Sequence, residues 1–308
     1  MVEKVKGKVL QKILVTGASG MLGSDLCGEL SEDYEVIGLD FSHCPPRPAP
    51  CASFLECDIT NRDKIVESIV SVKPDLVIHA AAWTNVDGCE REPDKTRKVN
   101  GEGTRNVAQA ASRLDIRLLY ISTDFVFDGT GGSAYTEKDD TNPLNIYGES
   151  KLQGELAVRA LDKYIIIRSG WLYGSNGKNF VDTILNEAKK ESELAVVDDQ
   201  RGSPTYTRDL AKAIDKLIEI SPRSAKEIYH ITNKGEVSWF DYAREILNIA
   251  GVKGVKVMPI TSIRLARPAK RPAFSILNNA KFERAAGFSM RPWQEALRDY
   301  IGSRPGGN

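Results

Sequence analysis

The chain has 308 residues, of which 41% are hydrophobic and 27% are charged, so it is long enough for one large α/β domain or for two domains that share an interface. Lys plus Arg and Asp plus Glu both number 42, and the resulting net charge of zero argues against a general binder of nucleic acid. The five cysteines form no Cys-x-x-Cys pair and no apolar run reaches about 18 residues, which favours reduced thiols in a cytoplasmic protein over disulfides, a zinc site or a membrane span.

The first predicted strand, residues 12–16, runs directly into a glycine-rich turn. Gly17, Gly20 and Gly23 follow with the spacing G-x-x-G-x-x-G, and a helical pattern comes next. Glycines let such a turn bend tightly and let backbone N–H groups approach a pyrophosphate at a helix N-terminus. The order of strand, glycine turn and helix therefore predicts a dinucleotide site rather than a plain tight turn.

The second predicted strand, residues 35–40, ends in Asp40. An acid about 20 residues after such a turn hydrogen-bonds the ribose diol of the adenosine, which favours NADH. Ser42, His43 and Arg47 follow closely, and an arginine at this point can hold the 2′-phosphate of NADPH. The sequence leaves the choice between NADH and NADPH open.

Strands and helices continue to alternate to about residue 170. We expect strands at 54–58, 75–79, 117–121 and 164–168 and helices at 62–72, 93–114 and 147–160. This alternation predicts an α/β fold built on a doubly wound, Rossmann-like parallel sheet. His79 precedes the end of its strand, and we expect it to be structural.

Small and polar residues follow two of these strands. Ala80, Ala81 and Ala82 come after one strand, and small residues there let a flat ligand lie close to the backbone. Ser122 and Thr123 come after the next strand, on the same edge of the predicted sheet. We expect a ligand at this edge; the alternative for the two hydroxyls is a turn or helix-capping role.

Tyr147 and Lys151 are spaced as neighbours on one face of a helix. A nearby ammonium favours the phenolate and lowers the pKa of a tyrosine, which can then exchange a proton near neutral pH. The spacing alone is weak, because most such pairs are exposed neighbours on a helix surface.

Beyond residue 170 the pattern becomes irregular. We expect residues 1–170 and about 205–233 to form the dinucleotide-binding domain, and about 171–204 and 234–308 to form a smaller α/β lobe that binds the substrate. Arginines of this lobe, Arg267 and Arg271 first among them, could hold a phosphate by bidentate hydrogen bonds; otherwise they are solvated loop charges. The expected elements are helices at 179–188, 208–220, 239–250 and 293–301 and strands at 194–197, 227–232 and 255–260.

Four further segments complete a resemblance. They are 80–87 (AAAWTNVD), 122–129 (STDFVFDG), 143–148 (PLNIYG) and 199–205 (DQRGSPT). Together with the glycine turn and the Tyr147/Lys151 pair, they resemble the dTDP-4-dehydrorhamnose reductase family of extended short-chain dehydrogenases/reductases. The resemblance covers the chain except its extreme termini.

The resemblance implies that NADPH or NADH reduces the 4-keto group of a dTDP-linked 6-deoxy-4-ketohexose. Thr123 would hydrogen-bond the keto oxygen, Tyr147 would protonate it, and Lys151 would lower the pKa of Tyr147 and hold the nicotinamide ribose. The implied cofactor site comprises Gly17, Ser19, Gly20, Met21, Leu22, Gly23, Asp40, Asp58, Ile59, Ala80, Ala81, Ala82, Asn100, Ser122, Tyr147 and Lys151. The implied substrate site comprises Thr84, Val86, Thr123, Asp124, Trp171, Asn179, Gln200, Arg201, Arg267 and Arg271.

Three alternatives accompany this interpretation. Related 4,6-dehydratases carry Thr-Asp-Glu at this strand, and Phe125 stands here in place of the acid, which argues against dehydration. An epimerase fits the downstream loops less well. The chain also resembles the NADP-binding β regulatory subunit of methionine adenosyltransferase, which has no turnover of its own. Glu283, Glu295 and Asp299 match no metal-ligand set, so we expect no metal; whether the protein is a monomer or a homodimer stays open.

Overall fold

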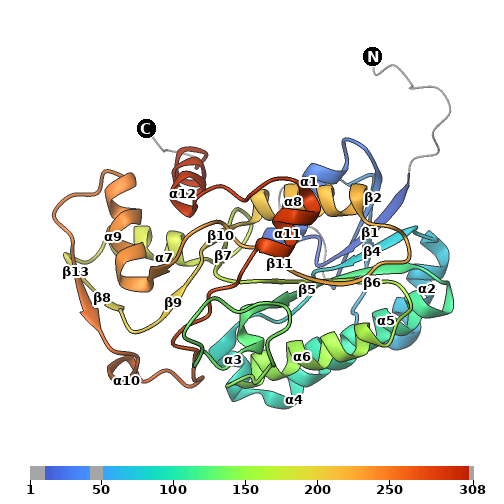
Figure 1. Ribbon diagram of the computed structural model, residues 1–308, viewed down its shortest axis with the longest axis horizontal. Coiled ribbons are helices and arrows are strands. Elements are labelled where there is room, and N and C mark those ends of the chain that lie inside the picture. The colour runs from blue at the N-terminus through green and yellow to red at the C-terminus, as the bar shows by residue number, and fades with distance from the viewer. Residues whose placement is uncertain (1–10, 42–50, 305–308) are drawn as a thin grey trace.

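The computed structural model describes residues 11–41 and 51–304 and is centred on a seven-stranded sheet (Figure 1). Every neighbouring pair of its strands is parallel, in the order β11-β6-β5-β4-β1-β2-β3. The doubly wound sheet expected from the sequence is confirmed. Its strands are β1 (Lys12–Thr16), β2 (Glu35–Asp40), β3 (Ser53–Glu56), β4 (Leu76–His79), β5 (Arg117–Thr123), β6 (Tyr164–Ser169) and β11 (Lys226–His230).

The strand order reverses between β1 and β4. The chain winds from β1 through β2 to β3 in one direction and then from β4 through β5 and β6 to β11 in the other. Ligands of open α/β sheets bind at the carboxyl edge of such a reversal. The glycine turn after β1 and the alanine run after β4 both lie at this edge.

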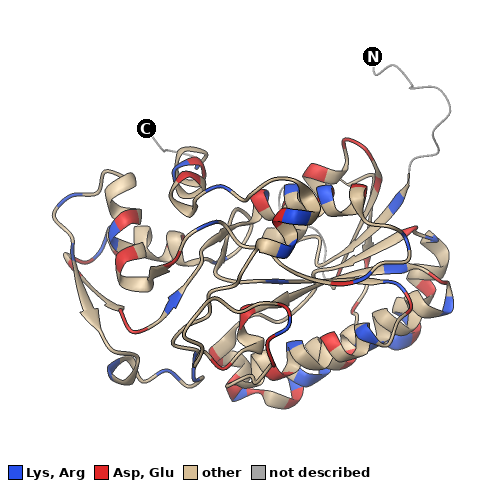
Figure 2. Ribbon diagram, in the orientation of Figure 1, with Lys and Arg blue, Asp and Glu red and all other residues tan. Residues whose placement is uncertain are grey.

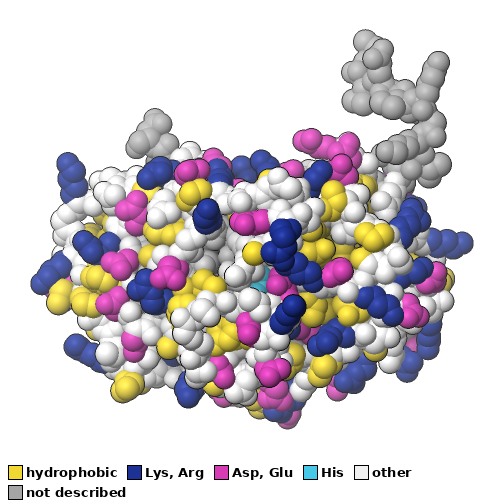
Figure 3. All heavy atoms as spheres, in the orientation of Figure 1, with side chains coloured by type: hydrophobic (Ala, Val, Ile, Leu, Met, Phe, Trp, Pro, Cys, Tyr) yellow, Lys and Arg dark blue, Asp and Glu magenta, His cyan; other side chains and the backbone are white. Residues whose placement is uncertain are grey.

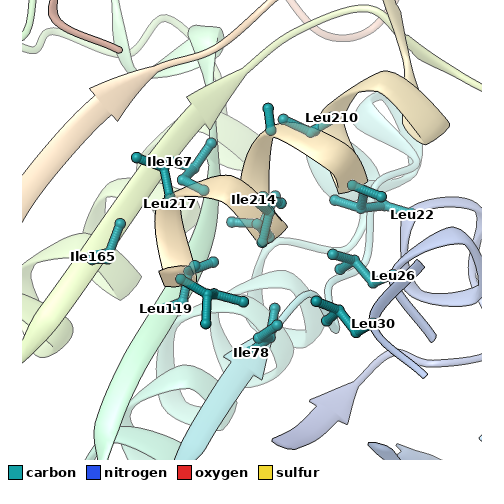
Figure 4. Packing of buried hydrophobic residues seen from close by; sticks show 14 of the residues in the cluster. Leu22, Leu26, Leu30, Ile78, Leu119, Ile165, Ile167, Leu210, Ile214 and Leu217 are labelled. Carbon is teal, nitrogen blue, oxygen red and sulfur yellow. The ribbon is translucent and has the colours of Figure 1, made fainter. Parts of the chain in front are cut away.

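Helices cover both faces of the sheet. One face carries α1 (Met21–Leu30), α8 (Thr207–Ile220) and α11 (Ala280–Ala286), and the other carries α2 (Arg62–Val72), α5 (Thr104–Arg113) and α6 (Ile146–Arg159). Figure 4 shows Leu26 and Leu30 of α1 facing Ile214 of α8 above the strands. Alternate residues of each strand point to opposite faces, so both faces are apolar and buried.

A second hydrophobic core lies beside the carboxyl edge. Its elements are β7 (Leu172–Tyr173), α7 (Phe180–Glu187), β8 (Glu193–Val197), β10 (Thr205–Tyr206), α9 (Trp239–Ile249), β13 (Lys256–Ile260) and α12 (Trp293–Gly302). β8 pairs with β13 and β7 with β10, both in parallel. β9 (Arg201–Gly202) pairs antiparallel with β12 (Val237–Ser238), and α10 (Ser262–Leu265) follows β13. The segment from α11 to Met290, by contrast, packs into the core of the main sheet through Phe282.

Several boundaries differ from those expected. The strand expected at 117–121 continues to Thr123, and the strand expected at 227–232 is Lys226–His230 and joins the main sheet beside β6. The single helix expected at 93–114 is divided into α4 (Pro93–Thr96), a π-helical segment (Arg97–Gly103) and α5. Helix α3 (Val86–Arg91) was not expected at all. Its N-cap residue, Asn85, accepts a hydrogen bond from Gly88 N (3.0 Å). An Asn at this position is a local sequence signal for the start of a helix, but it follows the alanine run directly and was not recognised there.

The surface carries basic and acidic residues in mixture. Figures 2 and 3 show Lys, Arg, Asp and Glu interspersed over the helices and over the face drawn. Among the described residues, no helix is long and apolar enough to cross a membrane. Ser42, His43 and Arg47, on which a preference for NADPH depended, lie outside the described residues.

Candidate active site

The glycine turn presses directly on the alanine run at the carboxyl edge. Gly17 has a φ of 71°, and a Cβ on it would come within 2.7 Å of Ala81 N. Only glycine tolerates both this left-handed backbone and this approach. A Cβ on Gly23 would meet the carbonyl of Gly17 at an impossible distance, so the turn and α1 pack together only with glycine there.

Groups around the turn fit a pyrophosphate and a ribose. Ser19 N donates to Asp40 Oδ2 (3.0 Å), while the Ser19 hydroxyl oxygen is buried and has no hydrogen-bond partner among the described residues. Helix α1 begins at Met21, so its N-terminus points from the same turn. Asp40 Oδ1 accepts from Phe41 N (2.8 Å), which fixes the carboxylate at the end of β2. An unpartnered buried hydroxyl beside a helix N-terminus is what an anionic ligand would satisfy.

Asn100 is held inside the frame of the site. It is fully buried in the π-helical segment, and its side chain accepts from Trp83 N (2.8 Å) and donates to Trp83 O (3.1 Å) and Ser150 Oγ (3.0 Å). These bonds tie the segment after β4 to α6. Nearby, Ile59 is buried against Gly103, and Asp58 accepts from Thr60 N (2.8 Å) at the end of the β3 segment.

Thr123, Asp124 and Tyr147 come together at the carboxyl end of β5. Asn145 caps α6 by accepting from Gly148 N (2.8 Å), and this places Tyr147 in the first turn of the helix. Thr123 Oγ donates to Asp124 Oδ1 (3.0 Å), and the hydroxyl lies close enough to the Tyr147 phenol to lower the pKa of that phenol. Thr123 also accepts from Phe125 N (3.2 Å), so the capping role weighed for it is real.

The pKa of Tyr147 differs in direction from the sequence-based expectation. Burial raises it well above its usual value, and the nearby Thr123 hydroxyl opposes only part of that rise. Lys151 Nζ instead donates to Ile121 O (2.7 Å) and lies 4.2 Å from the centre of the Tyr120 ring. Burial lowers the pKa of Lys151 to about 7, with the carboxylate of Glu155 opposing. The expected lowering of the Tyr147 pKa by Lys151 is therefore wrong for this conformation.

A paired charge cluster lies one turn further along α6. Glu155 Oε1 accepts from Arg168 Nε (2.9 Å) and from the Ser122 hydroxyl, and its Oε2 accepts from Arg168 Nη2 (2.7 Å). Glu155 is fully buried and Arg168 is 2% exposed. Ser122 thus contacts this cluster rather than the open edge.

His79 is structural in its contacts, as expected. It is fully buried between the hydroxyls of Thr16 (2.7 Å) and Thr104 (3.0 Å), and burial lowers its pKa to about 3. The neutral ring therefore joins β1, β4 and α5.

Trp171 is packed against residues of the lobe. Its ring stacks on Trp239 with centroids 3.4 Å apart and an interplanar angle of 2°. A Cβ on Gly202 would overlap the indole, so that position requires glycine. One face of Trp171 is therefore occupied by Trp239.

Two other expected substrate residues are engaged within the protein. Asn179 caps α7 by accepting from Asp182 N (2.9 Å) and donates to Gly174 O (3.0 Å) and Tyr300 Oη (3.1 Å). Arg201 is exposed and pairs with Glu236 (3.1 Å). Gln200 is buried in the same loop.

Arg267 and Arg271 converge on a third residue, Asp87. Arg267 Nη1 lies 2.9 Å from Asp87 Oδ2, and Arg271 Nη2 lies 3.0 Å from Asp87 Oδ1. These contacts bring the last part of the chain to α3, next to Thr84, which is exposed, and Val86, which is half-buried. Sequence reasoning named both arginines but missed Asp87, although it stands in the segment 80–87.

Comparison with known proteins now identifies the family. Residues 11–304 match the model described as "RmlD substrate binding domain". The chain belongs to this family. It is 39% identical to the spore coat polysaccharide biosynthesis protein SpsK of Bacillus subtilis (strain 168), covering 96% of this chain and 98% of that protein.

Two reductases extend the match. The chain is 39% identical to the dTDP-4-dehydrorhamnose reductase of Aggregatibacter actinomycetemcomitans, covering 94% of this chain and 98% of the relative. Its fold matches the crystal structure of dTDP-4-dehydrorhamnose reductase from Bacillus anthracis in complex with NADP, with a TM-score of 0.87, 37% identity and coverage of 96% and 100% of the two chains.

Proposed function

We propose that this protein is an NAD(P)H-dependent oxidoreductase that reduces the 4-keto group of a dTDP-linked 6-deoxy-4-ketohexose, as dTDP-4-dehydrorhamnose reductases do. The observation that carries the proposal is that the first turn of α6, with Tyr147, packs against the end of β5, with Thr123, next to the strand reversal and the glycine turn. The family match over residues 11–304 supports it.

The proposed chemistry assigns the acid to Tyr147. The bound dinucleotide supplies a hydride to the keto carbon. Tyr147 gives its phenolic proton to the keto oxygen, on which negative charge develops. Burial keeps this phenol protonated at neutral pH, so the acid is in the required form before the reaction. The low-polarity surroundings also strengthen its hydrogen bond to the developing charge.

Residues around the glycine turn hold the cofactor in this proposal. The α1 N-terminus and the Ser19 hydroxyl contact the pyrophosphate, and Asp40 contacts the adenosine ribose. Lys151, held at the carboxyl end of β5 by Ile121 O, turns from that carbonyl to the nicotinamide ribose. The negative charge of Asp40 disfavours the 2′-phosphate of NADPH and so favours NADH. A relative binds NADP, so we propose that the protein uses both NADH and NADPH.

The substrate is proposed to lie between Asp124, Trp171 and the Arg267/Arg271 pair. Its diphosphate would compete with Asp87 for the two guanidinium groups, because both are anionic and both accept bidentate hydrogen bonds. Thr84 and Val86, at the start of α3, border this region. We further propose that the protein is cytoplasmic. Whether it is a monomer or a homodimer is to be measured.

The test is an oxidation assay in which the purified protein is mixed with NADPH or NADH and dTDP-4-dehydrorhamnose. The absorbance of the reduced dinucleotide measures its oxidation. We expect oxidation that depends on the sugar and is lost in Tyr147→Phe. The matched control is Tyr164→Phe, which removes a phenol from the amino end of β6, away from the carboxyl edge. Binding of the dinucleotide without oxidation with any 4-ketosugar would overturn the proposal and favour a regulatory subunit.

A further inference from the structure

The Lys151 ammonium is buried without a carboxylate of its own. Lys151 is 3% exposed, and it forms no ion pair with any residue of 11–41 or 51–304. Glu155, one turn further along α6, acts on the ammonium through space but gives both of its oxygens to Arg168. A buried ammonium without a counter-ion tends to lose its proton, so the groups that touch it decide whether it stays charged.

The ammonium contacts a backbone carbonyl and an aromatic ring. Lys151 Nζ donates to Ile121 O (2.7 Å) and lies over the Tyr120 ring, 4.2 Å from its centroid. A cation within about 6 Å of a ring centroid is attracted by the negative ring face, and the attraction is stronger away from water. An ammonium has three donors, of which Ile121 O takes one. The ring attracts the charge without binding one particular proton, so donors are left for a ribose hydroxyl.

The Tyr120 ring is itself held in place. It is fully buried and stacks on His79, with ring centroids 5.5 Å apart and an interplanar angle of 25°. Its hydroxyl donates to Lys151 O (3.3 Å). A Cβ on Gly154 would come within 2.4 Å of this hydroxyl, so glycine at that position leaves room for the phenol. The ring under the ammonium is therefore fixed by both β4 and α6.

The other ionisable groups around the ammonium have different states and partners. Tyr147 lies one turn before it and Glu155 one turn after it on α6, and His79 faces it from β4. Burial lowers the pKa of His79 to about 3 and raises that of Tyr147, so both are neutral at pH 7. Asp124 and Cys89 in turn act on the Tyr147 phenol. The Tyr120 ring is thus an attractive contact for the ammonium that these groups do not replace.

We propose that Tyr120 is a positioning residue of the cofactor site, whose ring face holds the Lys151 ammonium charged and in place for the nicotinamide ribose. This inference rests on the cofactor role proposed above for Lys151. On binding of the dinucleotide, the ammonium exchanges Ile121 O for a ribose hydroxyl. It keeps its contact with the ring during this exchange, because the attraction is to the ring face and not to a single acceptor atom.

Removal of the ring should change how NADPH binding depends on pH. Burial lowers the pKa of Lys151 to about 7 in the cofactor-free protein, so the affinity for NADPH should fall as the pH rises above this value. Tyr120→Leu removes an attraction that favours the charged form, which should lower this pKa further. The fall in affinity should begin about one pH unit lower, with binding about 10-fold weaker at pH 8 and a smaller loss at pH 6.

The experiment is calorimetric titration of the full chain with NADPH between pH 6 and 9. Tyr120→Phe keeps the ring and loses only the hydroxyl, so its pH profile should follow that of the wild type. Replacement of Tyr120 by pentafluorophenylalanine keeps a ring of similar shape but removes its negative face. This variant fills the core that Tyr120→Leu leaves partly empty, and its profile should shift in the same direction as that of Tyr120→Leu.

The matched control is Tyr229→Leu on β11, at the edge of the sheet. Lys281 Nζ lies 4.9 Å from the centroid of the Tyr229 ring and donates to Ile228 O (2.7 Å), which repeats the contacts of the buried ammonium. Lys281 also pairs with Glu227 (2.7 Å) and is partly exposed. Tyr229→Leu should therefore leave both the affinity for NADPH and its pH dependence unchanged.

A Lys151→Met background separates positioning from packing. There the ring has no ammonium to hold, so adding Tyr120→Leu should weaken NADPH binding by less than about twofold. Two outcomes would overturn the inference. The first is a loss of affinity in Tyr120→Leu that is the same at every pH, and the second is an equal loss with and without the Lys151 ammonium.

The readout is binding, so it is independent of sugar reduction. A wild-type protein that binds NADPH but reduces no 4-ketosugar would overturn the proposed function, while the shifted pH profile would still support the role of Tyr120. A wild-type protein that reduces the sugar, with the same pH profile in all variants, would overturn the inference alone.

Discussion

Two buried polar clusters lie about two turns apart on α6, and they differ in how completely their groups are paired. Both oxygens of Glu155 accept hydrogen bonds, from Ser122 and from two nitrogens of Arg168. In the cluster around Tyr147, Asp124 Oδ2 has no partner among the described residues. Buried polar groups are normally satisfied, so an unsatisfied group at the edge of a sheet indicates where a ligand or a proton transfer is to be expected.

The two clusters are expected to have different roles. The Glu155–Arg168 cluster links α6 to β6 and fixes the helix, while the Tyr147 cluster keeps groups free for chemistry. Changes in the first should therefore appear as lost stability, and changes in the second as lost turnover with little loss of stability.

The largest effect is expected for Tyr147→Phe. Loss of the general acid should lower kcat by about 10²–10⁴-fold, which is the contribution expected of a positioned proton donor. Oxidation of NADPH measures kcat, and thermal unfolding measures stability, which should stay close to that of the wild type. A Tyr147→Phe enzyme with wild-type kcat would contradict the division between the two clusters.

Glu155→Gln should show the opposite behaviour. It leaves the Arg168 guanidinium buried without its counter-charge, which should lower the free energy of unfolding by about 3–5 kcal/mol. Urea unfolding measures this loss. The control is Lys163→Ala, which breaks the exposed Lys163–Asp115 pair and should cost less than about 1 kcal/mol. Equal losses in the two variants would show that the buried pair has no special role.

The pH dependence of stability should distinguish the ammonium of Lys151 from the paired charges. Its pKa is lowered by burial to about 7 in the folded protein, while in the unfolded chain it is near 10.5. Between these values the unfolded state binds more protons, so this group makes stability rise with pH from about 7 to 10.5. Lys151→Met should remove that rise in the cofactor-free protein, as followed by urea unfolding at several pH values. A rise of the same size in Lys151→Met would contradict the buried, unpaired state of the ammonium.

The smallest effects on activity are expected at the edge of the proposed substrate site, where Arg267 and Arg271 both pair with Asp87. Arg271 is 16% exposed and should contribute more to diphosphate binding than Arg267, which is 51% exposed. Arg271→Ala should raise KM for the sugar nucleotide by about 10-fold with kcat little changed, the size expected for a hydrogen bond to a charged group. Arg267→Ala should raise KM less. A larger rise in KM for Arg267→Ala than for Arg271→Ala would mean that exposure does not decide how much each arginine contributes to binding.

The sequence predicted the parts of the fold that depend on local patterns. The apolar runs identified the main strands, and the glycine spacing and the Tyr147 segment located the edge where they meet. The strands of the smaller lobe were harder to predict from the sequence. β7, β9, β10 and β12 are only two residues long, and they form only because they pair with distant segments.

The partners of the site residues were beyond local pattern. The pairing of Asp87 with Arg267 and Arg271 and of Trp171 with Trp239 joins positions far apart in the chain. The pKa of Tyr147 was predicted in the wrong direction for the same reason: helical spacing placed Lys151 nearby, but burial and the contact with Ile121 O decide the outcome.

The most direct test of the central claim is hydride transfer itself. NADPH carrying deuterium at carbon 4 of the nicotinamide would be incubated with the protein and dTDP-4-dehydrorhamnose, and the sugar nucleotide analysed by mass spectrometry and NMR. We predict deuterium on carbon 4 of the hexose in the wild-type reaction and, over the same short incubation, at most about one hundredth as much in the Tyr147→Phe reaction. Recovery of unlabelled sugar with the deuterium still on the dinucleotide would contradict the account.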